Sequence, residues 1–188
     1  MLSKSLLIIC LLTASNAWSL TQFLDLETND DECTVCCSKL TPRPQQNYTY
    51  YQDTGRFVGG SGEWAIDTHG YSGNSEGRND PTKQCIHSVG PAPVGQYNLT
   101  GCKDTMHNAT VIRPCSFWMI PLDESKSCGR SGIMLHGCQC CTDGDTTEPP
   151  IDGCSAGCVV IRRAERMKVR VGDIITVEHY EPKKNLAQ

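Results

Sequence analysis

Short apolar runs alternate with turn-forming residues along most of the chain, and this pattern predicts β-structure. Residues 47–51 and 56–58 flank Asp53-Thr54-Gly55, whose composition is typical of a hairpin turn. Six further runs have the length of a strand and are rich in apolar or β-branched residues: 63–67, 95–99, 116–122, 133–136, 169–171 and 174–177. We therefore expect a mainly β domain.

A single segment favours a helix. Residues 162–167 contain no Gly, Pro or β-branched residue, so we expect one short helix there. Residues 70–81 are rich in Gly, Ser and Asn and predict a long loop, a kind of segment that is commonly functional. Residues 143–150 are polar and end in two prolines, which predicts a second loop.

The first residues have the pattern of a signal peptide. Lys4 precedes an apolar run at 6–12 that is too short to span a bilayer, and Ala17-Trp18-Ser19 fits a small-residue cleavage site. A retained membrane anchor is the alternative, but no stop-transfer pattern follows. The expected organisation is a signal peptide, a cysteine-containing N-terminal tether, one domain and a C-terminal tail: residues 1–19, 20–50, 51–180 and 181–188.

Cysteine content indicates the compartment. The chain has 13 cysteines, and removal of the predicted signal peptide would take away only Cys10. Such density behind a signal peptide predicts a secreted, disulfide-stabilised protein. We expect the Cys33-x-x-Cys36-Cys37 cluster to pin the tether to the domain, because a redox Cys-x-x-Cys motif would need a βαβ context that the sequence lacks.

Glycosylation signals and charge agree with an extracellular protein. Asn47, Asn98 and Asn108 each begin an Asn-x-Thr sequon. The formal net charge is −4, and it becomes about −5 once Lys4 is removed. Without a basic patch or an RNA-binding signature, nucleic acid is not an expected partner.

Two segments carry the best candidate for chemistry, Leu135-His136-Gly137 and Ser155-Ala156-Gly157-Cys158. A cysteine nucleophile reacts as the thiolate and needs a nearby base, for which His136 is suited. Gly157 permits a close backbone approach, and amides at this turn could face a developing oxyanion. Ser155 is placed to hold the geometry of the pair, or is simply a turn residue.

These segments resemble the active-site signature of L,D-transpeptidases, and more closely that of the L,D-transpeptidase-like effectors of bacterial type VI secretion. His-Gly, a loop and Ser-x-Gly-Cys form the common core of the signature. The closer match adds three segments, and together the motifs cover roughly residues 55–180 in the family's order. These segments are Tyr71-Ser72-Gly73 with Gly77-Arg78-Asn79, Gly90-Pro91-Ala92-Pro93-Val94-Gly95-Gln96-Tyr97, and Arg130-Ser131-Gly132.

The resemblance implies an L,D-transpeptidase-like β-sandwich or barrel that acts on bacterial peptidoglycan stem peptides. Cys158 would attack the carbonyl that joins an L-centre to a terminal D-amino acid, and His136 would move the proton. Backbone amides of Gly157 and Cys158 would hold the oxyanion, and no metal or organic cofactor would be needed. The enzyme would then be an antibacterial L,D-transpeptidase or L,D-carboxypeptidase, and we expect a monomer.

Four further residues are candidates for substrate binding. The Arg130 guanidinium could bind a substrate carboxylate through its two-pronged geometry, although a structurally paired arginine is the alternative. Tyr71, Ser72 and Gly73 would form one wall of the cleft, or simply a turn.

The abundance of cysteine departs from the bacterial family and leaves alternatives open. Cys154 lies four residues before Cys158, so a local disulfide could consume the nucleophile. The protein would then be a non-catalytic, disulfide-rich module that binds peptidoglycan or another ligand, or a structural extracellular protein. Cys138, Cys140 and Cys141 follow His136 and either stiffen the loop or form a zinc-like ligand set, against which disulfides compete in an oxidising compartment.

Overall fold

The structure is a computed structural model that describes residues 37, 40–106, 111–138 and 154–183. The predicted signal peptide, the loop at 143–150 and the residues Cys33, Cys36, Asn108, Cys140 and Cys141 lie outside the described residues.

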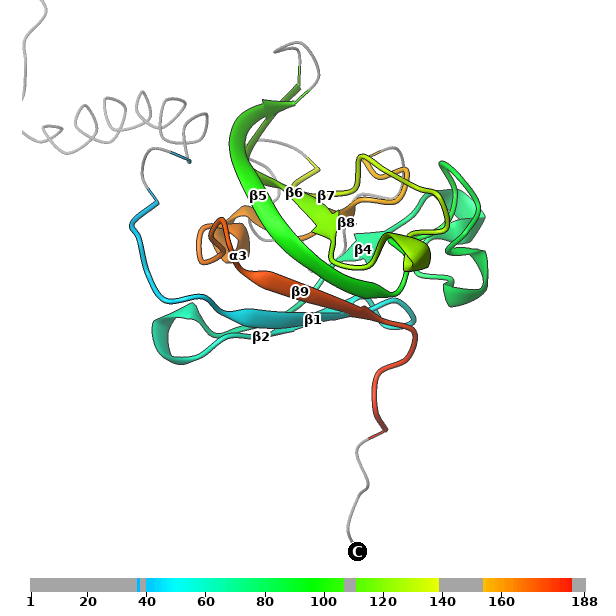
Figure 1. The fold of residues 1–188 in the computed structure, drawn as a ribbon, viewed down its shortest axis with the longest axis horizontal. Helices are drawn as coiled ribbons and strands as arrows, with labels where there is room; N and C mark the ends of the chain where they lie inside the picture. The colour runs from blue at the N-terminus through cyan, green and yellow to red at the C-terminus, as the bar shows by residue number, and fades with distance from the viewer. Residues whose placement is uncertain (1–36, 38–39, 107–110, 139–153, 184–188) are drawn as a thin grey trace, which may run out of the picture.

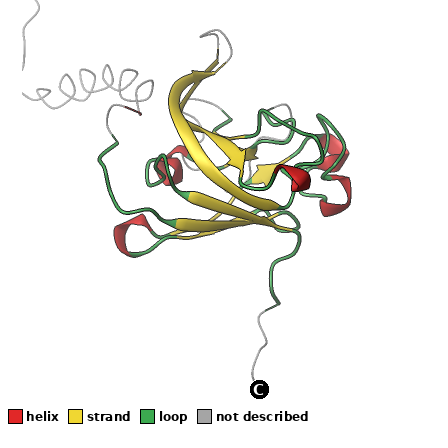
Figure 2. Ribbon diagram, viewed as in Figure 1, coloured by secondary structure: helices red, strands yellow, loops and turns green. Residues whose placement is uncertain are grey.

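Nine strands make up one sheet in the order β3-β2-β1-β9-β5-β6-β7-β8-β4 (Figures 1 and 2). The pairs β1–β9 and β7–β8 are parallel, and the other pairs are antiparallel. The strands are β1 Asn47–Tyr51, β2 Arg56–Gly59, β3 Ile66–His69, β4 Tyr71–Ser72, β5 Gly95–Met106, β6 Val111–Pro121, β7 Met134–His136, β8 Val159–Val160 and β9 Ile174–Glu178. Within the described part, the α-helix α3 spans Arg163–Arg166, and the 3-10 helices are Gly62–Trp64, Ser75–Gly77, Pro81–Lys83 and Glu124–Lys126.

The two edges of the sheet are joined by a single residue, so the sheet nearly closes into a barrel. β3 pairs with β2 and β4 pairs with β8, yet only Gly70 separates β3 from β4 in the chain. A Cβ at Gly70 would lie 2.1 Å from the carbonyl oxygen of Val160, so only glycine lets the chain pass this close to β8.

Alternation along the strands fills the barrel with one hydrophobic core. In β1 the buried residues are Tyr48 and Tyr50, and in β9 they are Ile175 and Val177, which is the period of two expected for a strand with one buried face. The same core contains Phe117, Leu135 and Val159 from the far side of the sheet. The prediction of a mainly β, disulfide-containing domain with one short helix is thereby confirmed.

Three details of the predicted pattern were wrong. Of the strand predicted at residues 63–67, only residues 66 and 67 lie in a strand, β3, because residues 62–64 form a 3-10 helix. Residues 169–171, predicted as a strand, form part of a turn, because the Asp173 carboxylate accepts a hydrogen bond from the Arg170 amide at 2.8 Å. The predicted loop at 70–81 contains the short strand β4 and a 3-10 helix, since Tyr71 and Ser72 pair with β8.

The segment before β1 is fastened to the domain at two points. Cys37 forms a disulfide with Cys102 of β5, as expected for a cysteine that pins the tether. Arg43 forms a buried ion pair with Asp173, at 2.5 Å, and also donates to the Lys168 carbonyl at 2.7 Å. The sheet itself begins at Asn47, before residue 51 where the domain was expected to start.

Replacement of Arg43 by Ala should destabilise the fold by about 3–5 kcal/mol, because it leaves the Asp173 carboxylate buried without its partner. The Arg43 and Asp173 side chains are 2% and 1% exposed. Urea unfolding measures the effect. The matched control is Arg56→Ala, which removes ion pairs to Asp67 and Glu181 at the surface and should change the unfolding midpoint far less. Equal losses in both variants would contradict the argument.

Candidate active site

The sheet places His136 and Cys158 on the same side of β7 and β8. These strands run parallel with Leu135 opposite Val159 and His136 opposite Val160. Leu135 and Val159 face the barrel core, so His136 and Val160 face outward. Cys158 lies two residues before Val160, and residues two apart in an extended chain point to the same side. The nucleophile and base expected from the sequence therefore share one face of the sheet.

Hydrogen bonding sets the tautomer of His136, which is 1% exposed. Its Nδ1 lies 2.7 Å from the carbonyl oxygen of Gly137. A carbonyl only accepts hydrogen bonds, so Nδ1 carries the proton and the lone pair of the neutral imidazole is at Nε2. This is the form in which a histidine can take a proton from a thiol.

Cys158 is present as a half-buried thiol. Its sulfur lies 3.8 Å from the carbonyl oxygen of Gly132. Cys154, the neighbour expected to compete for this sulfur, forms a disulfide with Cys138 instead. That bond also removes Cys138 from the alternative zinc ligand set, and the residues described here hold no group of three or more potential metal ligands.

Ser155 organises the turn that carries Cys158. Its hydroxyl donates to the Cys158 carbonyl at 2.6 Å and accepts from the amides of Gly73 and Gly157 at 3.1 and 3.0 Å. The Gly157 amide, expected to face an oxyanion, is thus directed at Ser155 in this structure. Of the two amides expected to hold the oxyanion, that of Gly157 is therefore already engaged within the turn.

Ser72 fastens the same turn from the other side. This fully buried side chain donates to the Gly157 carbonyl at 3.0 Å and accepts from the Ala92 amide at 2.8 Å. Tyr71 is also buried, at 2% exposure, with the Arg78 guanidinium 4.3 Å from its ring centre. The Tyr71-Ser72-Gly73 segment therefore lies beneath the Cys158 turn and supports it.

Arg130 connects three segments of the site. Its guanidinium donates to the carbonyls of Gln84 at 2.7 Å, Pro91 at 2.5 Å and Ala156 at 3.0 Å. The residue is only 6% exposed. A substrate carboxylate would have to share this guanidinium with three backbone carbonyls.

Two supporting residues were not singled out by the sequence reasoning. The side-chain oxygen of Asn79 accepts from the Ser72 amide at 2.9 Å and from the Tyr50 hydroxyl at 2.7 Å. Gln84 supplies a carbonyl to Arg130 and a side-chain oxygen that accepts from the Val94 amide at 2.8 Å. Asn79 belongs to one of the recognised motifs, which is a signal for it, whereas nothing in the sequence distinguished Gln84.

Two disulfides bracket the site. Cys138 is two residues after His136 and pairs with Cys154, directly before Ser155. Cys85 follows Gln84 and pairs with Cys128, two residues before Arg130. Each bond therefore ties together two segments that contribute to the site.

Loss of the Cys138–Cys154 disulfide should lower the turnover of a peptidoglycan tetrapeptide more than loss of the Cys37–Cys102 disulfide does. In the double variant Cys138→Ser/Cys154→Ser we expect turnover to fall by about 10- to 100-fold, because small displacements of reacting groups carry large rate penalties. The matched control is Cys37→Ser/Cys102→Ser, which removes the bond between the tether and β5. The rate of tetrapeptide turnover, measured below the melting temperature of both double variants, checks this prediction. Equal losses of turnover in the two double variants would contradict it.

Two of the sequons fall on described residues. Asn47 is exposed at the start of β1, and Asn98 is half-buried in β5 between β6 and β9. Glycosylation at either residue remains a prediction.

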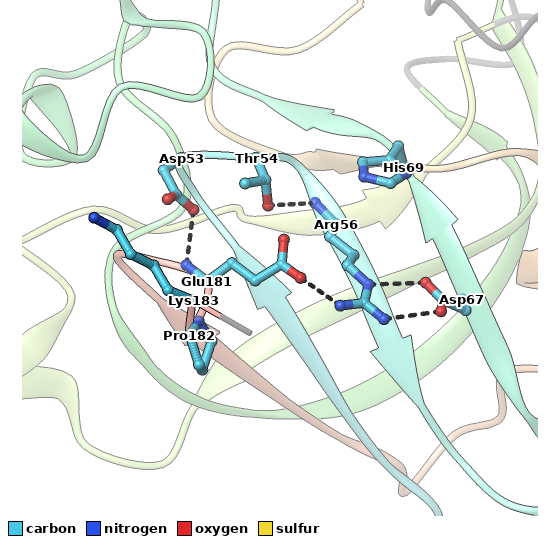
Figure 3. A pocket seen from close by; sticks show the side chains of 8 residues that line it. All are labelled: Asp53, Thr54, Arg56, Asp67, His69, Glu181, Pro182 and Lys183. Atoms are coloured by element: carbon cyan, nitrogen blue, oxygen red, sulfur yellow. Dashed lines mark hydrogen bonds and ion pairs between the residues drawn. The ribbon is translucent and has the colours of Figure 1, made fainter. Parts of the chain in front are cut away.

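A separate groove of about 590 Å³ lies on the outer surface of β2 and β3 (Figure 3). Arg56 crosses it between Asp67 and Glu181, with hydrogen bonds to Asp67 of 2.9 and 2.8 Å. His69 also lines this groove. None of the residues expected to take part in catalysis lines this groove.

The chain is similar in structure to several solved L,D-transpeptidases. That from Stackebrandtia nassauensis has 16% identity and a TM-score of 0.44, with 88% of this chain and 69% of that chain covered. L,D-transpeptidase 1 of Mycobacterium tuberculosis has 13% identity and a TM-score of 0.41, with 71% and 61% covered. The enzyme from Xylanimonas cellulosilytica has 17% identity and a TM-score of 0.43, with 73% and 63% covered. This chain thus spans less than two thirds of the length of the last two.

No curated protein matches the sequence. A family model does match, that of the Tlde1 domain, over residues 66–179. The match includes every segment in which the motifs were recognised, from Tyr71 to Cys158, and confirms the resemblance to the L,D-transpeptidase-like effector family. Since it spans more than half of the chain, the chain belongs to the Tlde1 domain family.

Proposed function

We propose that this protein is a secreted, cysteine-dependent L,D-transpeptidase or L,D-carboxypeptidase that acts on peptidoglycan stem peptides in an antibacterial role. The observation that carries the proposal is the convergence of separate motifs on one turn. Ser72, Gly73 and Arg130 all bond to the segment 155–157, which precedes Cys158 on the face that also carries His136. Such convergence is what a positioned nucleophile needs.

The proposed reaction has two stages. The Cys158 sulfur attacks the carbonyl carbon between an L-centre and a terminal D-amino acid, while Nε2 of His136 takes the thiol proton. The new C–S bond forms and the C–N bond breaks, with the proton passing from the imidazolium to the leaving amine. Water or a second amine then attacks the thioester, gives its proton to His136 and releases the thiol. Water yields carboxypeptidase activity, and an amine yields transpeptidation.

The remaining residues have supporting roles in this proposal. Ser155 holds the turn, and the Cys158 amide faces the oxyanion that develops on the attacked carbonyl. Tyr71, Ser72 and Gly73 form the wall behind the turn. The substrate would be a peptidoglycan stem peptide, no metal or organic cofactor takes part, and the protein acts as a monomer.

Secretion is supported by the cysteines. Three disulfides lie within the described residues, and such bonds persist in oxidising compartments. No described helix is long and apolar enough to cross a membrane. The binding-module alternative relied on a disulfide at Cys158, whereas Cys154 pairs with Cys138.

The test is incubation of the disulfide-intact protein with a peptidoglycan tetrapeptide, followed by mass spectrometry. Hydrolysis would appear as loss of the terminal D-amino acid, and transpeptidation as its exchange for an added amine. A mass increase on the tryptic peptide with Cys158 would reveal the thioester. Retention on insoluble peptidoglycan without turnover would support the binding module and overturn the enzymatic proposal.

A further inference from the structure

Arg130 has an environment that substrate binding alone does not explain. The side chain is buried, and its guanidinium donates three hydrogen bonds to backbone carbonyls. Two of these carbonyls, Gln84 and Pro91, belong to the segment before β5, and the third, Ala156, belongs to the turn that carries Cys158. These hydrogen bonds go to neutral carbonyls, so the buried arginine keeps its positive charge with no carboxylate among these three acceptors.

The guanidinium also lies directly against Gly157, the residue before Cys158. A Cβ at Gly157 would be 1.6 Å from Nη2 of Arg130, so the glycine leaves the space that the guanidinium fills. Gly157 has φ +129, a region that side-chain-bearing residues rarely adopt. The turn at residues 156–157 therefore packs directly against the Arg130 guanidinium.

The charge of Arg130 acts on Cys158. Burial lowers the pKa of Arg130, while negative charge at Tyr97 and at Cys158 opposes that shift. The attraction is mutual, so the guanidinium favours the thiolate form of Cys158. Burial raises the pKa of Tyr97 to about 12, which leaves its hydroxyl neutral near pH 7 and Arg130 without a competing anion there.

We propose that Arg130 is a positioning residue that holds the Cys158 turn in place and stabilises the Cys158 thiolate by its charge. This inference rests on the proposed function, in which Cys158 is the nucleophile. Among the described residues, the titratable groups tied to Cys158 by charge or by strand register are the Arg130 guanidinium and the His136 imidazole on β7, with Tyr97 of β5 acting on the same guanidinium. The role differs from carboxylate recognition, because the charge acts on the enzyme's own thiol.

The experiment measures alkylation of Cys158 by iodoacetamide as a function of pH, read by intact mass on the disulfide-bonded protein. Arg130→Gln keeps hydrogen-bond donors but removes the charge, and Arg130→Lys keeps the charge. We expect the pH midpoint of alkylation to rise by about one unit in Arg130→Gln, with a roughly tenfold slower reaction at pH 7. In Arg130→Lys the midpoint should stay close to that of the wild type. Lys126→Gln, an exposed cation elsewhere, is the matched control.

An unchanged midpoint in folded Arg130→Gln would overturn the proposal, as would equal shifts in the Gln and Lys variants. If Arg130→Gln does not fold, the Arg130→Lys variant tests the proposal. Its retained charge must keep the pH midpoint of Cys158 alkylation close to that of the wild type, while its altered hydrogen-bond geometry lowers kcat. Alkylation needs no substrate turnover. A shifted midpoint without peptidoglycan activity would therefore refute the proposed function and leave the role of Arg130 standing.

Discussion

Replacement of Cys158 by Ala is expected to abolish turnover of peptidoglycan tetrapeptides, with kcat/KM at least about 10³-fold lower than in the wild type. Without the sulfur no thioester can form, and the Ser155 hydroxyl of the same turn is engaged by the Cys158 carbonyl and two backbone amides. The change removes one atom from a half-buried side chain, so the melting temperature should stay close to that of the wild type. Product release followed by mass spectrometry measures the effect.

The comparison variant for this experiment is Lys126→Ala, which alters an exposed side chain and should keep full activity. Cys158→Ser is a second comparison, because it retains a polar atom of similar size but a much weaker nucleophile. A Cys158→Ala protein with undiminished turnover would show that the sulfur takes no part in the chemistry. The enzymatic proposal would then have to be abandoned.

Replacement of Gly157 by Ala should produce the second largest effect, a loss of at least about 100-fold in kcat/KM. The new methyl group would lie 1.6 Å from Nη2 of Arg130, at a φ of +129 that alanine disfavours. Either the guanidinium or the turn must move, and both movements displace Cys158. The measurement is turnover of the same tetrapeptide, together with the alkylation rate of Cys158.

Gly62→Ala separates backbone strain from this clash. Gly62 also has a positive φ, of +56, but its Cβ would meet no atom within 4 Å. A double variant that combines Gly157→Ala with Arg130→Gln supplies the second control. If the methyl group acts by displacing the guanidinium, the two losses should be less than additive. Fully additive losses would show that the clash with Arg130 is not the cause.

The sequence predicted the strands whose side chains alternate strongly. β1, β2 and β9 were expected at nearly their observed positions, because one face of each strand is buried in the core and the apolar period of two is visible. The strand predicted at residues 169–171 failed for a tertiary reason. Asp173 binds both Arg43 and the Arg170 amide there, and this capped turn competes with the apolar character of Val169 and Val171.

The same contrast applies to the site. The sequence determined which residues are the candidates for the chemistry, since Cys158, His136 and the family motifs are visible in the order of residues alone. It left open whether Cys154 would form a disulfide with Cys158, because several pairings are possible among the neighbouring cysteines. These are Cys138, Cys140, Cys141 and Cys154. Only the tertiary structure decided this, by bringing Cys154 beside Cys138 at the end of β7.

Tertiary structure also decided the hydrogen-bond partners of Arg130 and Ser72, which lie 28 and 86 residues before Cys158. The Arg130-Ser131-Gly132 motif is equally compatible with an arginine that binds a substrate carboxylate and with one whose partners lie within the protein. A guanidinium recognises any array of oxygen acceptors in its plane, and the acceptors here are backbone carbonyls that no sequence pattern marks. Composition and motif order thus determined the expected compartment, the fold class and the candidate nucleophile. The closure of the sheet through Gly70, and the buried hydrogen bonds that this closure permits, determined how that nucleophile is held.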